Sequence, residues 1–93
     1  MMNITYTLTN PSGSIMSNGT MPCSSYDDGL TLIHSKAFRE EHMSEHLGAR
    51  SKAMLMPAEV LSTWAVSDGW HVTQYMDTPD GIYSVRYEVD EAR

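Results

Sequence analysis

Apolar and polar side chains alternate strictly over residues 3–9, and this pattern limits the segment to one kind of structure. Two side chains that are neighbours in a β-strand point to opposite faces, so strict alternation indicates a strand with one buried face. The apolar set and the threonine set are Ile4, Tyr6 and Leu8 against Thr5, Thr7 and Thr9. A chain that begins in this way needs further strands to pair with, which predicts a β-sheet.

Two more strand-like segments lie near the other end of the chain, at residues 70–76 and 82–89. Residues 77–81 contain Pro79 and Gly81 and predict a five-residue hairpin loop between them. In the last strand one face is apolar and the other polar: Tyr83, Val85, Tyr87 and Val89 against Ser84, Arg86 and Glu88. We expect the apolar set to face the core.

A short second strand is predicted after the first. Pro11 and Gly13 favour a turn, and residues 14–17 can pair back onto residues 3–9. The Asn18-Gly19 dipeptide is typical of a further tight turn or a bulge, so the second strand either ends at Ser17 or continues to Met21.

Two helices are predicted in the middle of the chain. Ser25 suits an N-cap, with Asp28 three residues later, and an apolar stripe then leads to Gly48, so we expect a helix over about residues 25–47. Pro57 and the apolar spacing that follows predict a second helix at about 57–67. Residues 49–56 fit either a short buried strand or an extended segment.

The predicted order is therefore ββααββ, an α+β fold in which two helices pack on one face of a largely antiparallel sheet. The 93 residues form one domain over 1–93, because chains divide into separate cores only at about 250–300 residues. A content of 41% hydrophobic residues is typical of a folded domain.

Several classes of protein are disfavoured by composition. Neither a membrane-spanning apolar run nor a signal peptide is visible, which indicates a cytoplasmic protein. The single cysteine, Cys23, excludes an intramolecular disulfide and every cysteine-rich zinc framework. A net charge of −6 would repel the phosphate backbone, so nucleic-acid binding is not expected. No cofactor-binding motif occurs, and we predict no cofactor.

One short motif has the spacing of a metal site. His42, Glu45 and His46 match the H-x-x-E-H pattern, in which two histidines on one helix face bind zinc. No third ligand follows on a later helix, so we interpret these residues, with Arg39, as part of a solvated helix face. We expect no stoichiometric zinc and no hydrolase activity; the alternative is a small metal-dependent enzyme that uses the three residues.

Cys23 is the other candidate for catalysis. It precedes the N-terminus of the first predicted helix, where a thiolate would be stabilised, and His34 or His71 could act as a base. Asp27 and Asp28 would oppose a thiolate there. We therefore expect an unreactive, half-buried thiol, with a thiol enzyme as the alternative.

Five aromatic residues could form a platform for stacking nucleic-acid bases: Trp64, Trp70, Tyr75, Tyr83 and Tyr87. Such platforms also need a basic groove, and Arg86 is the only basic residue within 53–92. We interpret the five as core residues.

Acidic residues are concentrated in the second half of the chain. Residues 53–93 carry seven acidic and two basic side chains. A candidate partner-binding site combines Asp77, Asp80, Arg86, Glu88, Asp90 and Glu91. In a hairpin, the two loop aspartates and the three terminal acids would lie at opposite ends, about 20–25 Å apart. We predict a non-enzymatic accessory or inhibitor protein, of a kind that bacteria and phages encode, which occupies a basic surface of another protein.

The first 25 residues carry no charge at all, which is unusual for a strand at the edge of a sheet. If residues 3–9 lie at an edge of the sheet, we expect a two-fold homodimer through this strand. If they lie centrally, a neighbouring strand on each side already pairs with their backbone. A further alternative is a structural subunit that contacts only copies of itself.

Overall fold

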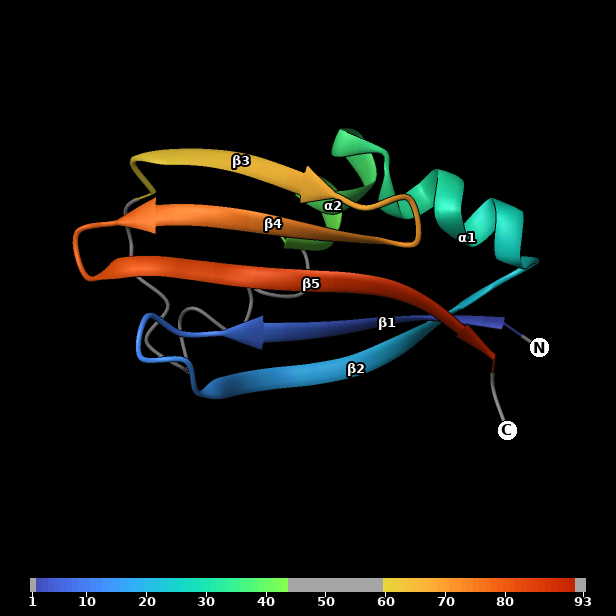
Figure 1. The fold of residues 1–93 in the computed structure, drawn as a ribbon, viewed down its shortest axis with the longest axis horizontal. Helices are drawn as coiled ribbons and strands as arrows, with labels where there is room; N and C mark the ends of the chain where they lie inside the picture. Colours follow the sequence, from blue (N-terminus) through green and yellow to red (C-terminus); the bar gives the residue numbers. More distant parts are fainter. Residues whose placement is uncertain (1, 44–59, 92–93) are drawn as a thin grey trace.

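The computed structural model describes residues 2–43 and 60–91, which form an antiparallel β-sheet and two helices (Figure 1). In chain order the elements are β1 Met2–Thr9, β2 Ile15–Cys23, α1 Tyr26–Ile33, α2 Lys36–His42, β3 Ser62–Ser67, β4 His71–Thr78 and β5 Gly81–Glu91. The strands lie side by side in the order β2-β1-β5-β4-β3. The α+β class is confirmed, with one strand more than the sequence predicts. No helix in the described parts of the chain has the length and apolar character needed to cross a membrane.

β1 lies inside the sheet and is paired on both sides. Tyr6, for example, lies opposite Gly19 of β2 and opposite Tyr87 of β5. The backbone of residues 3–9 therefore has no free edge for a second copy of the chain. The dimer expected through this strand required an edge position, and that condition is not met.

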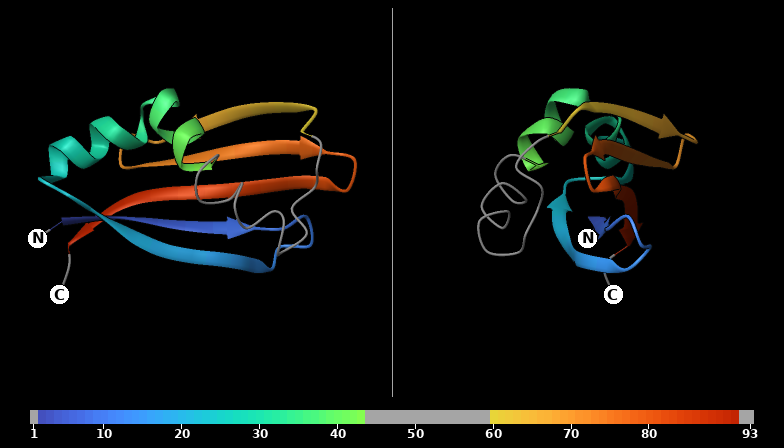
Figure 2. Two further views of the ribbon diagram at one scale, coloured as in Figure 1. Left: turned by 180° about the vertical axis from the view of Figure 1, so that it is seen from behind. Right: turned by 90° about the vertical axis from the view of Figure 1, so that its left-hand side faces the viewer.

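One face of the sheet, here called the inner face, holds the core. Its buried side chains come from alternate positions of three strands: Ile4, Tyr6 and Leu8 of β1, Val72 and Met76 of β4, and Tyr83, Val85 and Tyr87 of β5. Ile33 of α1 completes the buried cluster, and Leu30 and Phe38 pack against it. Figure 2 (left) shows the two helices in front of the strands when the molecule is seen from behind. The strict alternation of β1 and β5 thus predicts their core residues correctly.

The helical region is divided in two, so the continuous helix expected over 25–47 is wrong. Ser25 is the N-cap of α1, as predicted, and its hydroxyl accepts a hydrogen bond from the backbone N–H of Asp28 at 3.1 Å. α1 ends at Ile33, and Ser35 is the N-cap of α2, with its hydroxyl accepting from the backbone N–H of Phe38 at 3.3 Å. A second serine cap starts a second helix in a new direction. The predicted residues 44–47 lie outside the described residues.

Two glycines allow close approaches on the inner face. A Cβ on Gly29 of α1 would lie 2.8 Å from a methyl carbon of Val89, so glycine lets the helix rest directly on β5. A Cβ on Gly19 would lie 2.6 Å from the hydroxyl oxygen of Tyr6. Glycine at position 19 therefore leaves space for the Tyr6 ring. β2 continues through Asn18 and Gly19, so the turn or bulge expected there is wrong.

The helix predicted at 57–67 is contradicted over its second part, because Ser62–Ser67 form β3. This strand pairs antiparallel with β4, and the ring of Trp64 stacks on that of Tyr75 with centroids 5.5 Å apart. Residues 49–59 lie outside the described residues, so the expectations for 49–56 and for the start of that helix are not tested.

The hairpin of β4 and β5 is confirmed, but its loop is shorter than the predicted 77–81. Strand pairing continues to Thr78 opposite Gly81, which leaves Pro79 and Asp80 as the connecting pair. Gly81 has φ +121°, a value that favours glycine. The Thr78 hydroxyl donates to the carbonyl of Gly81 at 2.7 Å and accepts from the N–H of Asp80 at 3.2 Å. These bonds close the turn tightly.

Candidate functional site

The second face of the sheet, here called the outer face, carries the side chains that alternate with the core positions. Its rows follow from the strand register, and Figure 1 shows this side with β3 and β4 passing in front of α2. The residues that define it are Thr5, Thr7 and Thr9 of β1, Trp64 and Val66 of β3, His71, Thr73, Tyr75 and Asp77 of β4, and Ile82, Ser84, Arg86, Glu88 and Asp90 of β5. Hydroxyls cover the β1 side, and large apolar groups lie on the β3 side.

Large apolar side chains on the outer face are exposed. Trp64 is 41% and Val66 is 55% exposed, and Trp70 in the β3–β4 connection is 49% exposed. Assigning Trp64, Trp70 and Tyr75 to the core was therefore wrong, since Tyr75 is half-buried on the outer face opposite Trp64. Tyr83 and Tyr87 are buried as expected. We call Trp64, Val66, Trp70 and Tyr75 the aromatic patch.

Arg86 contacts the aromatic patch and a neighbouring carboxylate. Its guanidinium carbon lies 5.1 Å from the centre of the Trp70 ring, and its Nε forms an ion pair with Glu88. The Trp70 ring also lies against that of His71, with centroids 4.1 Å apart. A cation over an indole contributes about 0.5–1 kcal/mol at an exposed site. Arg86, Glu88, Trp70 and His71 thus contact one another in one cluster on the outer face.

The predicted acidic site is divided between the two ends of the outer face. Asp77 lies opposite Ile82, and Asp80 is in the adjacent turn, while Glu88 and Asp90 lie near the other end of β5. Asp90 is eight positions after Ile82 in β5, about 26 Å along the strand at 3.3 Å per residue. Glu91 ends β5. Arg86, Trp64, Val66 and Tyr75 lie between these two acidic ends, and Trp70 lies at the end that holds Glu88.

His42 of the predicted zinc motif is buried on the inner face, so its assignment to a solvated helix face was wrong. Its Nδ1 lies 2.8 Å from the hydroxyl oxygen of Tyr87, and its ring meets that of Tyr6 edge-on at 4.5 Å. Glu45 and His46 lie outside the described residues. Within residues 2–43 and 60–91, no three His, Cys, Asp or Glu side chains are grouped closely enough to hold a metal ion.

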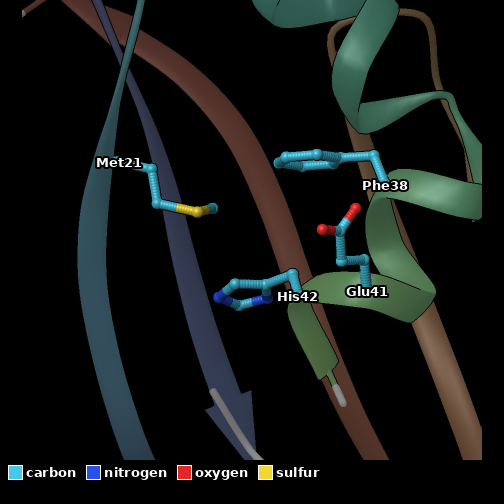
Figure 3. A pocket seen from close by; sticks show the side chains of 4 residues that line it. All are labelled: Met21, Phe38, Glu41 and His42. Carbon is cyan, nitrogen blue, oxygen red and sulfur yellow. The ribbon is translucent and has the colours of Figure 1, made fainter. Parts of the chain in front are cut away.

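A small pocket lies between β2 and α2 (Figure 3). It is lined by Met21, Phe38, Glu41 and His42 and has a volume of about 190 Å³. Sites for small molecules commonly measure about 300–1,000 Å³. This pocket is therefore too small to indicate a substrate or cofactor site by itself.

Arg39 is also buried, so its assignment to the solvated helix face was wrong. Its Nη1 donates to the carbonyl oxygen of Ile33 at 2.8 Å, and its Nε donates to Oε1 of Gln74 at 3.0 Å. Gln74 in turn donates from Nε2 to the carbonyl oxygen of Trp64 at 3.0 Å. This chain of hydrogen bonds connects α1, α2 and β4 to the backbone of β3.

Cys23 is a half-buried free thiol at the end of β2, as expected, and the structure does not pair it with a base. Cys23 lies opposite Met2 on the inner side, whereas His71 lies opposite Glu88 on the outer face. The Nδ1 of His34 lies 2.8 Å from the carbonyl oxygen of Leu30, in its own helix. Neither histidine predicted as a base is therefore placed to activate the thiol.

Burial of Tyr87 predicts a loss of stability at high pH. Burial raises the pKa of its phenol above the usual value near 10, and nearby Arg39 lowers that pKa in part. Above about pH 10 the unfolded chain releases this proton while the folded chain keeps it, so the free energy of unfolding should fall by up to about 1.4 kcal/mol per pH unit. Urea unfolding of wild type and Tyr87→Phe at pH 8–11 measures this. The slope should be smaller in Tyr87→Phe and unchanged in Tyr26→Phe, a control at an exposed tyrosine; equal slopes for wild type and Tyr87→Phe would contradict the prediction.

No protein family, curated protein or solved structure matches this chain.

Proposed function

We propose that the protein is a non-enzymatic binding module, an accessory or inhibitor protein that acts inside the cell by occupying a surface of a partner protein. In this proposal the outer face of the sheet is the binding surface, because the helices cover the inner face. The observation that supports it best is the group of exposed Trp64, Val66 and Trp70 on that one face.

The aromatic patch has the composition of an interface centre. Tryptophan, tyrosine and arginine are the residues that most often dominate binding energy, and a group of exposed apolar side chains commonly marks a contact site. Trp64 is stacked on Tyr75, and Arg86 lies over Trp70. Because these side chains are already ordered by one another, binding would lose little of their rotamer freedom.

Charge indicates the kind of partner. Four acidic side chains lie at or beside the ends of the outer face, Asp77, Asp80, Glu88 and Asp90, against the single basic Arg86. A partner with a basic rim around an apolar centre would complement both features. Glu91 and the net charge of −6 add to this attraction at longer range.

An enzymatic function receives less support from the described residues. His42 is occupied with the buried Tyr87, and Cys23 lies on the opposite side of the sheet from His71. A metal-dependent or thiol enzyme would need groups that the described residues do not bring together.

The test begins with affinity purification of a tagged chain from its host, followed by purification of the captured protein. Association with that partner should slow as salt rises, because screening acts over about 8 Å at physiological ionic strength. Replacing Asp77, Glu88 and Asp90 by Asn or Gln should lower the association rate about ten-fold, within the range that electrostatic steering covers. Replacing Trp64 by Ala should raise Kd at least about ten-fold through faster dissociation.

The matched control changes the same number of charges on the helices. Asp27→Asn, Glu40→Gln and Glu41→Gln alter exposed carboxylates of α1 and α2 and give the same net charge as the outer-face variant. If both triple variants slow association equally, the acidic ends of the outer face are not the site. If Trp64→Ala binds as tightly as wild type, the aromatic patch is not the interface.

A further inference from the structure

β3 leaves one edge of the sheet without a neighbouring strand among the described residues, since the strand order ends at β3 on that side. We propose that this edge pairs antiparallel with β3 of a second copy, so that one sheet continues through a two-fold dimer. This goes beyond the proposed function, because it concerns the edge of the sheet and a different partner.

The two edges of the sheet differ in their protection against strand pairing. β2 contains Pro22, which has no N–H to donate, and its pairing with β1 is interrupted by a register shift near Thr9. Proline and bulges are the usual devices that block an edge. β3 contains neither proline nor glycine, carries no charge over Ser62–Ser67, and is exposed at all six positions. Of the two edge strands, β3 is the one that lacks these protective features, so its edge can pair with another strand.

The sequence of β3 is complementary to itself in one register. With the two-fold axis at Ala65, small faces small, apolar faces apolar and hydroxyl faces hydroxyl. The facing pairs are Ala65 with Ala65 of the second copy, Trp64 with Val66, and Thr63 with Ser67. Facing residues of an antiparallel pair lie on the same side of the sheet, so Trp64 and Val66 would meet on the outer face. A register centred on Trp64 would instead place Ser62 against Val66 and Thr63 against Ala65. The first register is therefore the better match.

Charge permits this contact although the whole chain is acidic. Residues 60–67 are uncharged, so no like charges face each other in the chosen register. The first carboxylate beyond the strand, Asp68, would lie opposite the hydroxyl of Ser62. Like charges that face each other on paired strands destabilise the pair, and this register contains no such facing charges over residues 60–67.

The dimer would also extend the aromatic patch. Trp64 and Val66 are strongly exposed in the single chain, and each would pack side by side with the other residue of the second copy, while both keep their outer surfaces open to a partner protein. The Trp64 ring, stacked on Tyr75 on one side, would then contact the Val66 side chain of the second copy on the other. The hydrogen bond from Gln74 to the Trp64 carbonyl holds β3 in place before pairing.

Analytical ultracentrifugation over about 1–200 μM tests the proposal, with a monomer–dimer equilibrium as the expected result. Ala65→Glu places two carboxylates at the two-fold axis and should raise the dimer Kd at least about ten-fold. Thr20→Glu adds the same charge to exposed β2, the other edge, and should leave Kd unchanged. A wild type that stays monomeric throughout, or an equal effect of both variants, overturns the proposal.

A second measurement does not depend on the folding of Ala65→Glu. Ala65→Cys in a Cys23→Ser background should form a disulfide-linked dimer with oxidised glutathione, because facing residues in such a pair have Cα atoms within the range that a disulfide spans. Asn18→Cys in the same background places a thiol at an exposed position of β2 and should remain uncrosslinked. Crosslinking of both variants alike would contradict pairing through β3. The outcome is separate from the proposed function, since partner binding is measured on its own.

Discussion

Replacing Arg39 by Met is expected to lower the free energy of unfolding by about 2–4 kcal/mol, because two buried acceptors lose a charged donor. Arg39 is only 7% exposed, and its bonds to Ile33 and Gln74 connect the end of α1 with β4. Methionine fills much of the volume but leaves both oxygens without this donor. Removal of the buried charge offsets part of the loss, which limits the expected effect.

Three further variants, Arg39→Lys, Gln74→Leu and a double variant, show whether the hydrogen bonds or the packing are responsible. Arg39→Lys keeps the charge but not the planar group that reaches two acceptors at once, so it should remain clearly destabilised. In the double variant Arg39→Met with Gln74→Leu, the loss should be smaller than the sum of the single losses by about 1–2 kcal/mol. Urea unfolding of wild type and the four variants measures these losses. Strictly additive losses would show that the Arg39–Gln74 bond contributes nothing.

Burial of Arg39 could not be predicted because the break between the helices was not. On one continuous helix, Arg39 lies six residues after Ile33 and so about 240° around the axis, away from the core. The cap at Ser35 starts α2 in a new direction, and both Ile33 and Arg39 then reach the inner face. A serine in a helical stretch is also compatible with an unbroken helix, so the local signal was weak.

The strands at the two ends of the chain were predictable because their pattern is local and strict. β3 was missed because Val60, Leu61, Trp64 and Ala65 also fit helical spacing. Ser62–Ser67 contains β-branched residues and a tryptophan, which favour a strand when a partner is available. That partner is Tyr75, opposite Trp64 in β4, and the sequence alone does not show such a long-range register.

The candidate site was predicted in part. The acidic residues and Arg86 were recognised from charge, and the register places Asp77, Arg86, Glu88 and Asp90 on the outer face. The tryptophans were missed because large aromatic residues are usually assigned to the core. The signal that could have found Trp64 is the same alternation in 62–67 that would have identified β3.

Replacing Ile33 by Ala is expected to lower the free energy of unfolding by about 2–5 kcal/mol, a large part of the stability of a domain of this size. Ile33 is 0% exposed and ends α1 within the core cluster formed with β1, β4 and β5. Alanine removes three carbons from a closely packed site, and the surrounding strands cannot close the cavity because their register fixes them. Chemical unfolding followed by circular dichroism measures the change.

Leu32→Ala is the matched control, because it removes the same three carbons from the preceding residue of the same helix. Leu32 is 38% exposed, so its loss should cost less than about 1 kcal/mol. Both changes lie in the last turn of α1, and alanine suits a helix at either position, so helix propensity cannot produce a large difference. The difference between the two variants therefore reports the contact of α1 with the sheet. If Leu32→Ala were as destabilising as Ile33→Ala, the helix would present a different side to the core than the structure describes.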